Sequence, residues 1–234
     1  MDQTFDRLFY TRCSSLAGVD EVGVTSIAGP VVAACVVLPR LTPEDDLRLF
    51  LIDDSKKLSE KKRMQNAKII QKNAIAYGLG IVNPYEFDAI HSFSSCNLAM
   101  KRAIQNCFHR FGPYSLDFCI IDGDRQIDLD VPYELVVKGD MKSLSIASAS
   151  ILAKVHHDSI MKRFHSMRPE YGFNSNKGYR SEKHYEGLDK RGIWTGVHRT
   201  SLFPICREPH EQYQWTKRRK IWIKKTEHAL LEER

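Results

Sequence analysis

Apolar residues are concentrated in five short runs in the first 140 residues, separated by polar or glycine-rich segments. The run at 30–38 is β-branched and almost entirely apolar, which is typical of a strand buried on both faces. The runs at 16–21 and 117–122 end in acidic residues. The pattern predicts strands at 16–21, 30–38, 75–82, 117–122 and 133–138.

Between and after these strands, apolar residues recur at helical spacing. Leu98, Ile104 and Phe108 fall on one face of a helix that we expect to begin at a serine cap, Ser94 or Ser95. Strands that alternate with helices predict an α/β fold. Further helices are predicted at 83–91, from Ser59 and Glu60 onward, over 142–167 and near 181–191 up to Gly192, and 171–179 is predicted to be a polar loop.

Composition favours a folded protein with a substantial core. The chain has 234 residues, of which 42% are hydrophobic. No apolar run approaches the roughly 18 residues of a membrane span, and the start does not resemble a signal peptide. None of the six cysteines is at C-x-x-C spacing, and Cys35 and Cys119 lie in apolar runs, so we expect buried free thiols in a reducing, cytoplasmic setting.

Residues 207–234 differ from the rest of the chain. They hold eight Lys or Arg against five Glu, and Trp215 and Trp222 fall on one face of a helix. This stretch is either a helix that packs its tryptophans on the domain or a basic arm for nucleic-acid backbone. The net charge of +6 favours an anionic partner only weakly. We therefore expect one domain over 1–206 and a basic helical extension over 207–234.

Four acids occur where predicted strands or their loops end: Asp20, Glu21, Asp122 and Asp140. Ligands bind at strand ends in α/β sheets, and carboxylates that converge there repel each other unless a cation is present. Oxygen ligands favour Mg²⁺ or Mn²⁺ over zinc. The alternatives remain open, because an Asp after a strand is often a turn former and adjacent acids are usually solvated charges. In an extended strand, Asp20 and Glu21 point to opposite faces.

The sequence resembles the type 2 ribonucleases H, specifically bacterial ribonuclease HII. The resemblance covers most of residues 16–206. It rests on motifs that occur in the same order as in the family, and the fifth motif in the list that follows is specific by itself. The motifs are AGVDEV, AGPVVAACVVLP, DDSKKLSEKKR, IIDGD, VVKGDMKSLSIASASILAKVHHDSIM, YGFNSNKGY and GVHRTSLFPI. The resemblance implies a ribonuclease H-like fold, with a central mixed five-stranded sheet flanked by helices and a C-terminal helical region.

The implied activity is endonucleolytic cleavage of RNA in RNA–DNA hybrids, and of ribonucleotides embedded in DNA. Asp20, Glu21, Asp122 and Asp140 match the family's metal-binding acids, with Asp20 the best candidate to bridge two Mg²⁺ or Mn²⁺ ions. Such ions bracket the scissile phosphate at a separation of about 4 Å. One activates water and the other stabilises the departing 3′-oxygen, which leaves 5′-phosphate and 3′-hydroxyl ends. Asp158 matches a further acid outside this set.

The resemblance also implies substrate contacts. Tyr179 matches a tyrosine that stacks on the sugar 3′ of the ribonucleotide, although a tyrosine in such a loop can equally be a packed surface aromatic. Phosphate contacts are expected at several basic and hydroxyl residues. Without the resemblance, most of them would be interpreted as side chains that are simply exposed to solvent. These are Lys56, Lys57, Lys138, Lys142 and Ser143.

The chain departs from the family at the loop that reads the ribonucleotide 2′-hydroxyl. Gly-Arg-Gly becomes Gly23-Val24-Thr25, so no guanidinium is available, and a positive φ at Thr25 would be costly. Asn176 and Thr200 also stand where His and Arg are commoner. The alternatives to an ordinary enzyme are altered junction specificity and a weakened or non-catalytic hybrid-binding protein. We expect a monomer that binds RNA–DNA hybrid or ribonucleotide-containing duplex rather than a membrane, and a sliding clamp as partner stays open.

Overall fold

The computed structural model describes residues 3–40, 58–111, 116–124, 126–202 and 205. The chain groups into two compact units. The first comprises Met1–Val24 and Pro30–His157, and the second comprises Thr25–Gly29 and Asp158–Arg234. Residues 207–234 lie outside the described part, so the single domain over 1–206 and the basic extension stay predictions.

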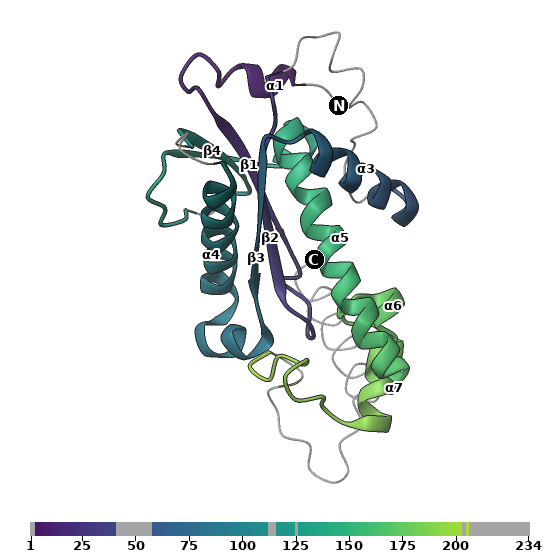
Figure 1. Cartoon of the computed structure of the whole chain (residues 1–234). Coiled ribbons are helices and arrows are strands. Elements are labelled where there is room, and N and C mark those ends of the chain that lie inside the picture. The colour runs from purple at the N-terminus through teal and green to yellow at the C-terminus, as the bar shows by residue number, and fades with distance from the viewer. Residues whose placement is uncertain (1–2, 41–57, 112–115, 125, 203–204, 206–234) are drawn as a thin grey trace, which may run out of the picture. The chain divides into compact units, whose positions relative to one another are not determined.

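The first unit is built on a mixed five-stranded sheet of order β3-β2-β1-β4-β5 (Figure 1). The pairs β1–β2 and β2–β3 are antiparallel, whereas β1–β4 and β4–β5 are parallel. The five predicted strands are confirmed, and so is the predicted α/β fold with a mixed sheet. The strands are β1 (Leu16–Val22), β2 (Val31–Val37), β3 (Ala76–Val82), β4 (Phe118–Asp122) and β5 (Tyr133–Val136).

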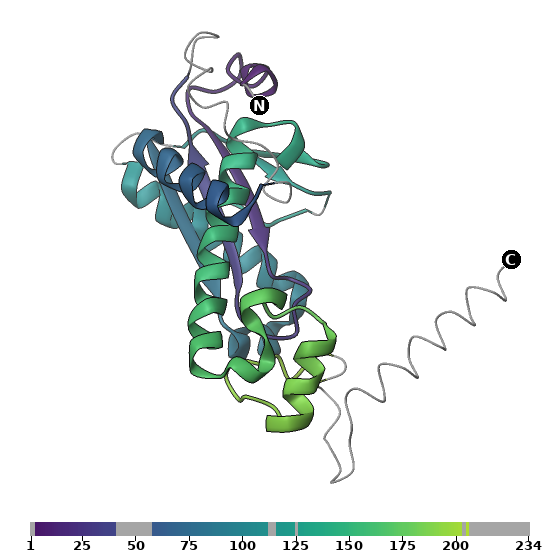
Figure 2. The ribbon, with the colours of Figure 1, turned by 90° about the vertical axis from the view of Figure 1, so that its right-hand side faces the viewer.

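Helices cover both faces of this sheet. Every residue of β2 is buried, as its unbroken apolar sequence predicts. Helix α4 (Pro84–Phe111) packs on β3 and β2, and the first turns of α5 (Leu144–Met167) lie on the other face (Figures 1 and 2). Ile146 at the start of α5 joins a buried cluster with Leu16 and Ile120. Hydrophobic burial on two faces thus fixes the strands whose ends carry the acids.

Helix α4 contains a break at His91. Its φ of 62° and ψ of 177° are not helical, so the two predicted helices are confirmed as segments on either side of this residue. The predicted serine cap is wrong, because Ser95 lies within the second segment and its hydroxyl donates to the His91 carbonyl oxygen at 2.6 Å. Arg102 of the second segment donates to both Glu86 oxygens at 2.6 and 3.1 Å. This ion pair links the two segments.

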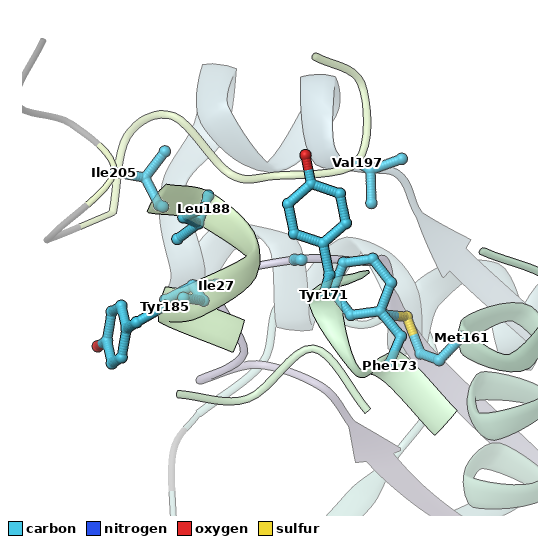
Figure 3. Packing of buried hydrophobic residues seen from close by; sticks show 9 residues of the cluster. Ile27, Met161, Tyr171, Phe173, Tyr185, Leu188, Val197 and Ile205 are labelled. Atoms are coloured by element: carbon cyan, nitrogen blue, oxygen red, sulfur yellow. The ribbon is translucent and has the colours of Figure 1, made fainter. Parts of the chain in front are cut away.

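The second unit has its own core. Tyr171 and Phe173 are fully buried and stack with ring centroids 5.3 Å apart, beside Met161 and Val197 (Figure 3). The predicted polar loop at 171–179 is therefore partly wrong: Tyr171 and Phe173 are core residues, and short helices form around them. The apolar side chains at two positions outweigh the polar neighbours that suggested a loop.

The remaining elements largely follow the sequence. Ser59 caps α3, where its side chain accepts from Lys62 N, and Gly192 ends α7 as predicted. Cys35 and Cys119 are buried free thiols. No helix in the described part of the chain is long and apolar enough to cross a membrane. The other elements are α1 (Thr4–Arg7), α3 (Glu60–Asn73), η1 (Gly139–Met141), η2 (Pro169–Tyr171), α6 (Phe173–Asn176) and α7 (Glu182–Arg191).

Gly80 on β3 allows α4 to approach the sheet. A Cβ atom there would lie 1.9 Å from the carbonyl oxygen of Ala99, so Gly80→Ala must displace the helix. We expect the free energy of unfolding, measured with urea, to fall by about 3 kcal/mol or more. Gly123→Ala is the control, because it adds a Cβ with nothing within 4 Å and costs only the strain of its φ of 107°, about 1–2 kcal/mol. Equal losses would contradict this packing.

Candidate active site

Two of the predicted acids lie at the carboxyl ends of neighbouring parallel strands. Asp122 is the last residue of β4, and Asp20 is near the end of β1. The register pairs Val19 with Ile121, so the next residues on the two strands are Asp20 and Asp122. Side chains at matching positions of adjacent strands point to the same face. The topology therefore brings these two carboxylates together.

Asp140 reaches the same strand ends through a short helix. Strand β5 runs parallel to β4 and pairs Val136 with Asp122. The chain then enters η1, where the backbone N–H of Gly139 donates to Asp122 Oδ1 at 2.6 Å. Asp140 is the next residue and is buried. A hydrogen bond from the backbone beside one acid to the carboxylate of another fixes Asp140 near Asp122.

Asp20 is a buried carboxylate with two acidic neighbours. Burial, Glu21 and Asp122 all raise its pKa well above the ordinary value. Hydrogen bonds from the Ser150 side chain on α5 and from the Glu21 N–H, the latter 2.7 Å from Oδ1, offset this only in part. Uncompensated negative charge in a buried place is the electrostatic mark of a cation site.

Glu21 faces a hollow on the α4 side. This hollow has an empty volume of about 550 Å³, is open to solvent, and is lined by Glu21, Asp122 and residues of α4 that include Ser92, Phe93 and Asn97. Asp20, by contrast, bonds with α5. The expected alternation of the adjacent acids is thus present. Asp122, which ends β4 beside Asp20, also contributes to the lining of the hollow.

The donor set fits hard divalent cations, although its side chains do not enclose one as they stand. Within the described residues, no group of three or more His, Cys, Asp or Glu side chains is arranged to hold a metal ion. One oxygen each of Asp20 and Asp122 accepts a backbone N–H. Carboxylate oxygens are the ligands that Mg²⁺ and Mn²⁺ prefer.

The altered loop, Gly23-Val24-Thr25, keeps a glycine at the position where the backbone has a positive φ. Gly23 has a φ of 87°, and a Cβ atom there would lie 2.7 Å from the Pro30 carbonyl oxygen. Thr25 is exposed and has no positive φ. The strain anticipated for a β-branched residue therefore does not arise, because glycine is retained where the backbone needs it.

Tyr179 follows a turn in the second unit and is partly exposed. The side chain of Asn176 shapes this turn: its Oδ1 accepts from Gly178 N at 2.9 Å and its Nδ2 donates to the Tyr171 carbonyl oxygen at 2.7 Å. The Gly178 carbonyl oxygen in turn accepts from Ile27 N at 2.9 Å. Asn176 thus gives the loop a defined conformation at the position where the resemblance had suggested a departure.

The predicted phosphate contacts separate into three groups. Lys138 and Lys142 are exposed beside η1 and stay candidates. Lys56 and Lys57 lie outside the described residues. Ser143 is fully buried, and its hydroxyl accepts from Ile146 N at 3.1 Å, so it caps the start of α5; its phosphate contact stays a prediction. The possible outer acid, Asp158, is buried within α5.

Sequence reasoning missed several residues around these acids. Ser150 was not predicted as a site residue, yet it bonds to Asp20. Ser92 and Asn97 were not predicted as site residues either, yet they line the hollow beside Glu21. A serine within an otherwise apolar stretch of the predicted helix was the available clue to Ser150.

The chain is similar to known proteins over most of its length. Residues 17–203 match the sequence model of the family Ribonuclease HII. Ribonuclease HII of Clostridioides difficile (strain 630) is 44% identical over 187 residues, which are 80% of this chain and 69% of that protein.

Solved structures share the fold. The ribonuclease H2 of Pyrococcus horikoshii OT3 is similar with a TM-score of 0.64 at 21% identity, covering 87% of this chain and 98% of that one. Bst-RNase HIII in complex with Mn²⁺ gives a TM-score of 0.67 at 18% identity, covering 82% and 68%. With the family match and the moderately identical relative, these findings show that the chain belongs to the Ribonuclease HII family and is an endoribonuclease that acts on RNA–DNA hybrids.

Proposed function

We propose that the chain hydrolyses the RNA strand of hybrids with two divalent cations, Mg²⁺ or Mn²⁺, held by Asp20, Glu21, Asp122 and Asp140. The products are 5′-phosphate and 3′-hydroxyl ends, and ribonucleotides embedded in DNA are also substrates. The observation that carries this proposal is the raised pKa of Asp20, caused by burial and by the nearby charges of Glu21 and Asp122. A protein keeps such repulsion where a cation relieves it.

The residues have separate tasks in this proposal. When bound, divalent cations activate water and neutralise the charge on the leaving oxygen. Asp20 would hold the cations together with Glu21 and Asp122, the two acids whose charges raise its pKa. Glu21 and Asp122 present carboxylates to the hollow in which we place the scissile phosphate. Ser150 and the Gly139 N–H hold Asp20 and Asp122 in orientation through hydrogen bonds.

Substrate is held by groups outside the acids. Lys138 and Lys142 are exposed cations that position phosphates, and such contacts make binding fall with salt. The backbone of Gly23, Val24 and Thr25 reads the 2′-hydroxyl, and Tyr179 stacks on the adjacent deoxyribose. The unstrained backbone at Thr25 supports this role despite the missing arginine.

Asp20→Asn is expected to lower the rate of hybrid cleavage by several orders of magnitude, since the cations lose their shared ligand. The same change removes a buried, repelled charge, so the thermal unfolding midpoint without metal should rise. Cleavage of a labelled RNA–DNA hybrid with Mg²⁺ or Mn²⁺, and melting of the metal-free protein, measure the two effects. A purely structural acid would lose both activity and stability.

Asp128→Asn is the matched control. It removes an exposed carboxylate that pairs with Lys101 at 2.8 Å and is not one of the four acids. Such a surface pair contributes about 0–1 kcal/mol to stability, so activity and unfolding should stay near those of the unchanged chain. If Asp20→Asn cuts hybrid as well as Asp128→Asn does, the metal-ligand assignment fails.

Junction recognition is tested with two duplexes, one with a single embedded ribonucleotide and one with several. We expect the second to be cut at least as well, because Val24 supplies no guanidinium for a phosphate. If the loop limits recognition, Val24→Arg with Thr25→Gly raises the rate on the single-ribonucleotide duplex. A strong preference of the unchanged chain for the single ribonucleotide would contradict the expected weakness.

A further inference from the structure

Two buried histidines in the second unit face each other. His184 Nε2 and His198 Nε2 are 3.1 Å apart, and both side chains are almost completely enclosed. The rings of Tyr171 and Phe173, part of the core in Figure 3, lie about them, with centroids 4.9 Å from His198 and 5.1 Å from His184 respectively. Neither histidine belongs to the acidic site.

The protons of this pair have one consistent arrangement. Trp194 N donates to His198 Nδ1 at 2.8 Å, so Nδ1 carries the lone pair and the neutral ring is protonated at Nε2. His198 Nε2 then donates to His184 Nε2, which leaves the proton of His184 on Nδ1. That atom lies 3.0 Å from the Tyr179 carbonyl oxygen and donates to it. The chain of donors thus ends on the residue proposed to stack on substrate.

Burial keeps the pair neutral. It lowers the pKa of His184 to about 4. Burial, the nearby His184 ring and Arg168 together lower the pKa of His198 to about 3. Tyr171, whose own pKa is raised by burial, also faces the pair. Both rings are therefore uncharged near pH 7, as the arrangement of ring protons described above requires.

The same loop is bonded to the segment that follows Val24. The Gly178 carbonyl oxygen accepts from Ile27 N at 2.9 Å and Ala28 N at 3.2 Å, and Arg180 Nη1 donates to the Thr25 carbonyl oxygen at 3.3 Å. The backbone of His198 forms a β-bridge with Ala28. Residues on both sides of Tyr179 thus bond with Thr25–Gly29, and His198 holds that segment as well.

We propose that His184 and His198 are positioning residues, whose ordered protons fix the Tyr179 loop and its attachment to Thr25–Gly29 for substrate recognition. This inference rests on the proposed role of Tyr179. The pair sets the orientation of the Tyr179 peptide, and therefore the direction in which the ring is presented. It touches no reacting atom.

Two substitutions at His184 separate positioning from packing. In His184→Gln, the amide oxygen takes the place of Nε2 and accepts from His198, but the donor to Tyr179 is lost. In His184→Asn, the amide nitrogen takes the place of Nδ1 and donates to Tyr179, but the acceptor for His198 is lost. Each variant loses one hydrogen bond of the pair, so each is the other's control.

The experiment is a double-mutant cycle with Tyr179→Ala, read as KM and kcat on an RNA–DNA hybrid, with thermal unfolding recorded for every variant. We expect His184→Gln to raise KM about tenfold, the value of one net hydrogen bond, and to add nothing in the Tyr179→Ala background. His184→Asn keeps the donor to Tyr179 and loses only its bond with His198, so it should raise KM by less than His184→Gln does, even though its unfolding midpoint falls. Losses that multiply, or a KM that follows the midpoint in both variants, would overturn the proposal.

A second measurement is independent of activity. Nitrogen NMR of the ring-labelled full chain should show neutral His184 protonated at Nδ1 and neutral His198 protonated at Nε2 at pH 7. A charged ring or the opposite tautomers would overturn the proposal by itself. If Tyr179→Ala cleaves like the unchanged chain while the tautomers are as expected, the sugar-stacking role fails and the positioning of substrate fails with it.

Discussion

The carboxyl group of Asp20 lies where water cannot stabilise its charge and where Glu21 and Asp122 repel it. This arrangement follows from the sheet, since β1 and β4 run parallel and end together. Helix α5 donates a hydrogen bond from Ser150, and η1 brings Asp140 close through the Gly139 N–H. The parallel pair therefore concentrates negative charge, and hydrogen bonds from the helices hold the carboxylates in place at the site that we propose binds cations.

In the proposed function, the acids and part of substrate choice are carried by different units. The four acids, Gly23 and Val24 belong to the first unit, whereas Thr25 and Tyr179 belong to the second. Within the second unit, hydrogen bonds join the Tyr179 loop to Thr25–Gly29, so these two segments share one support. Under this proposal, a change at Thr25 alters which junctions are cut and leaves the acids as they are.

Much of the fold could be predicted because burial leaves a clear pattern. The unbroken apolar run of β2 and the Ser59 and Gly192 helix ends are local properties, and the structure has them as expected. Tyr171 and Phe173 were missed because their neighbours are polar. The Ser95 cap was misplaced because the break at His91 depends on tertiary packing and on a strained φ, which periodicity does not contain.

The site was predictable in part for the same reason. An acid after an apolar strand is visible in sequence, and its identity as a ligand came from the family resemblance. The buried Ser143, by contrast, shows that a residue inside a recognised motif can cap a helix, because its hydroxyl accepts from Ile146 N. The His184–His198 pair was not foreseen, because the 3.1 Å approach of residues 14 positions apart depends on how the second unit packs.

The central claim is that the four acids form a divalent-metal site. Crystals of the chain with an uncleavable RNA–DNA hybrid and Mn²⁺, measured at the manganese absorption edge, test it most directly. The account predicts anomalous peaks within coordination distance of the Asp20 carboxylate, with Glu21, Asp122 and Asp140 as further ligands. Manganese bound elsewhere, or no peak at Asp20 while hybrid is bound, would contradict it.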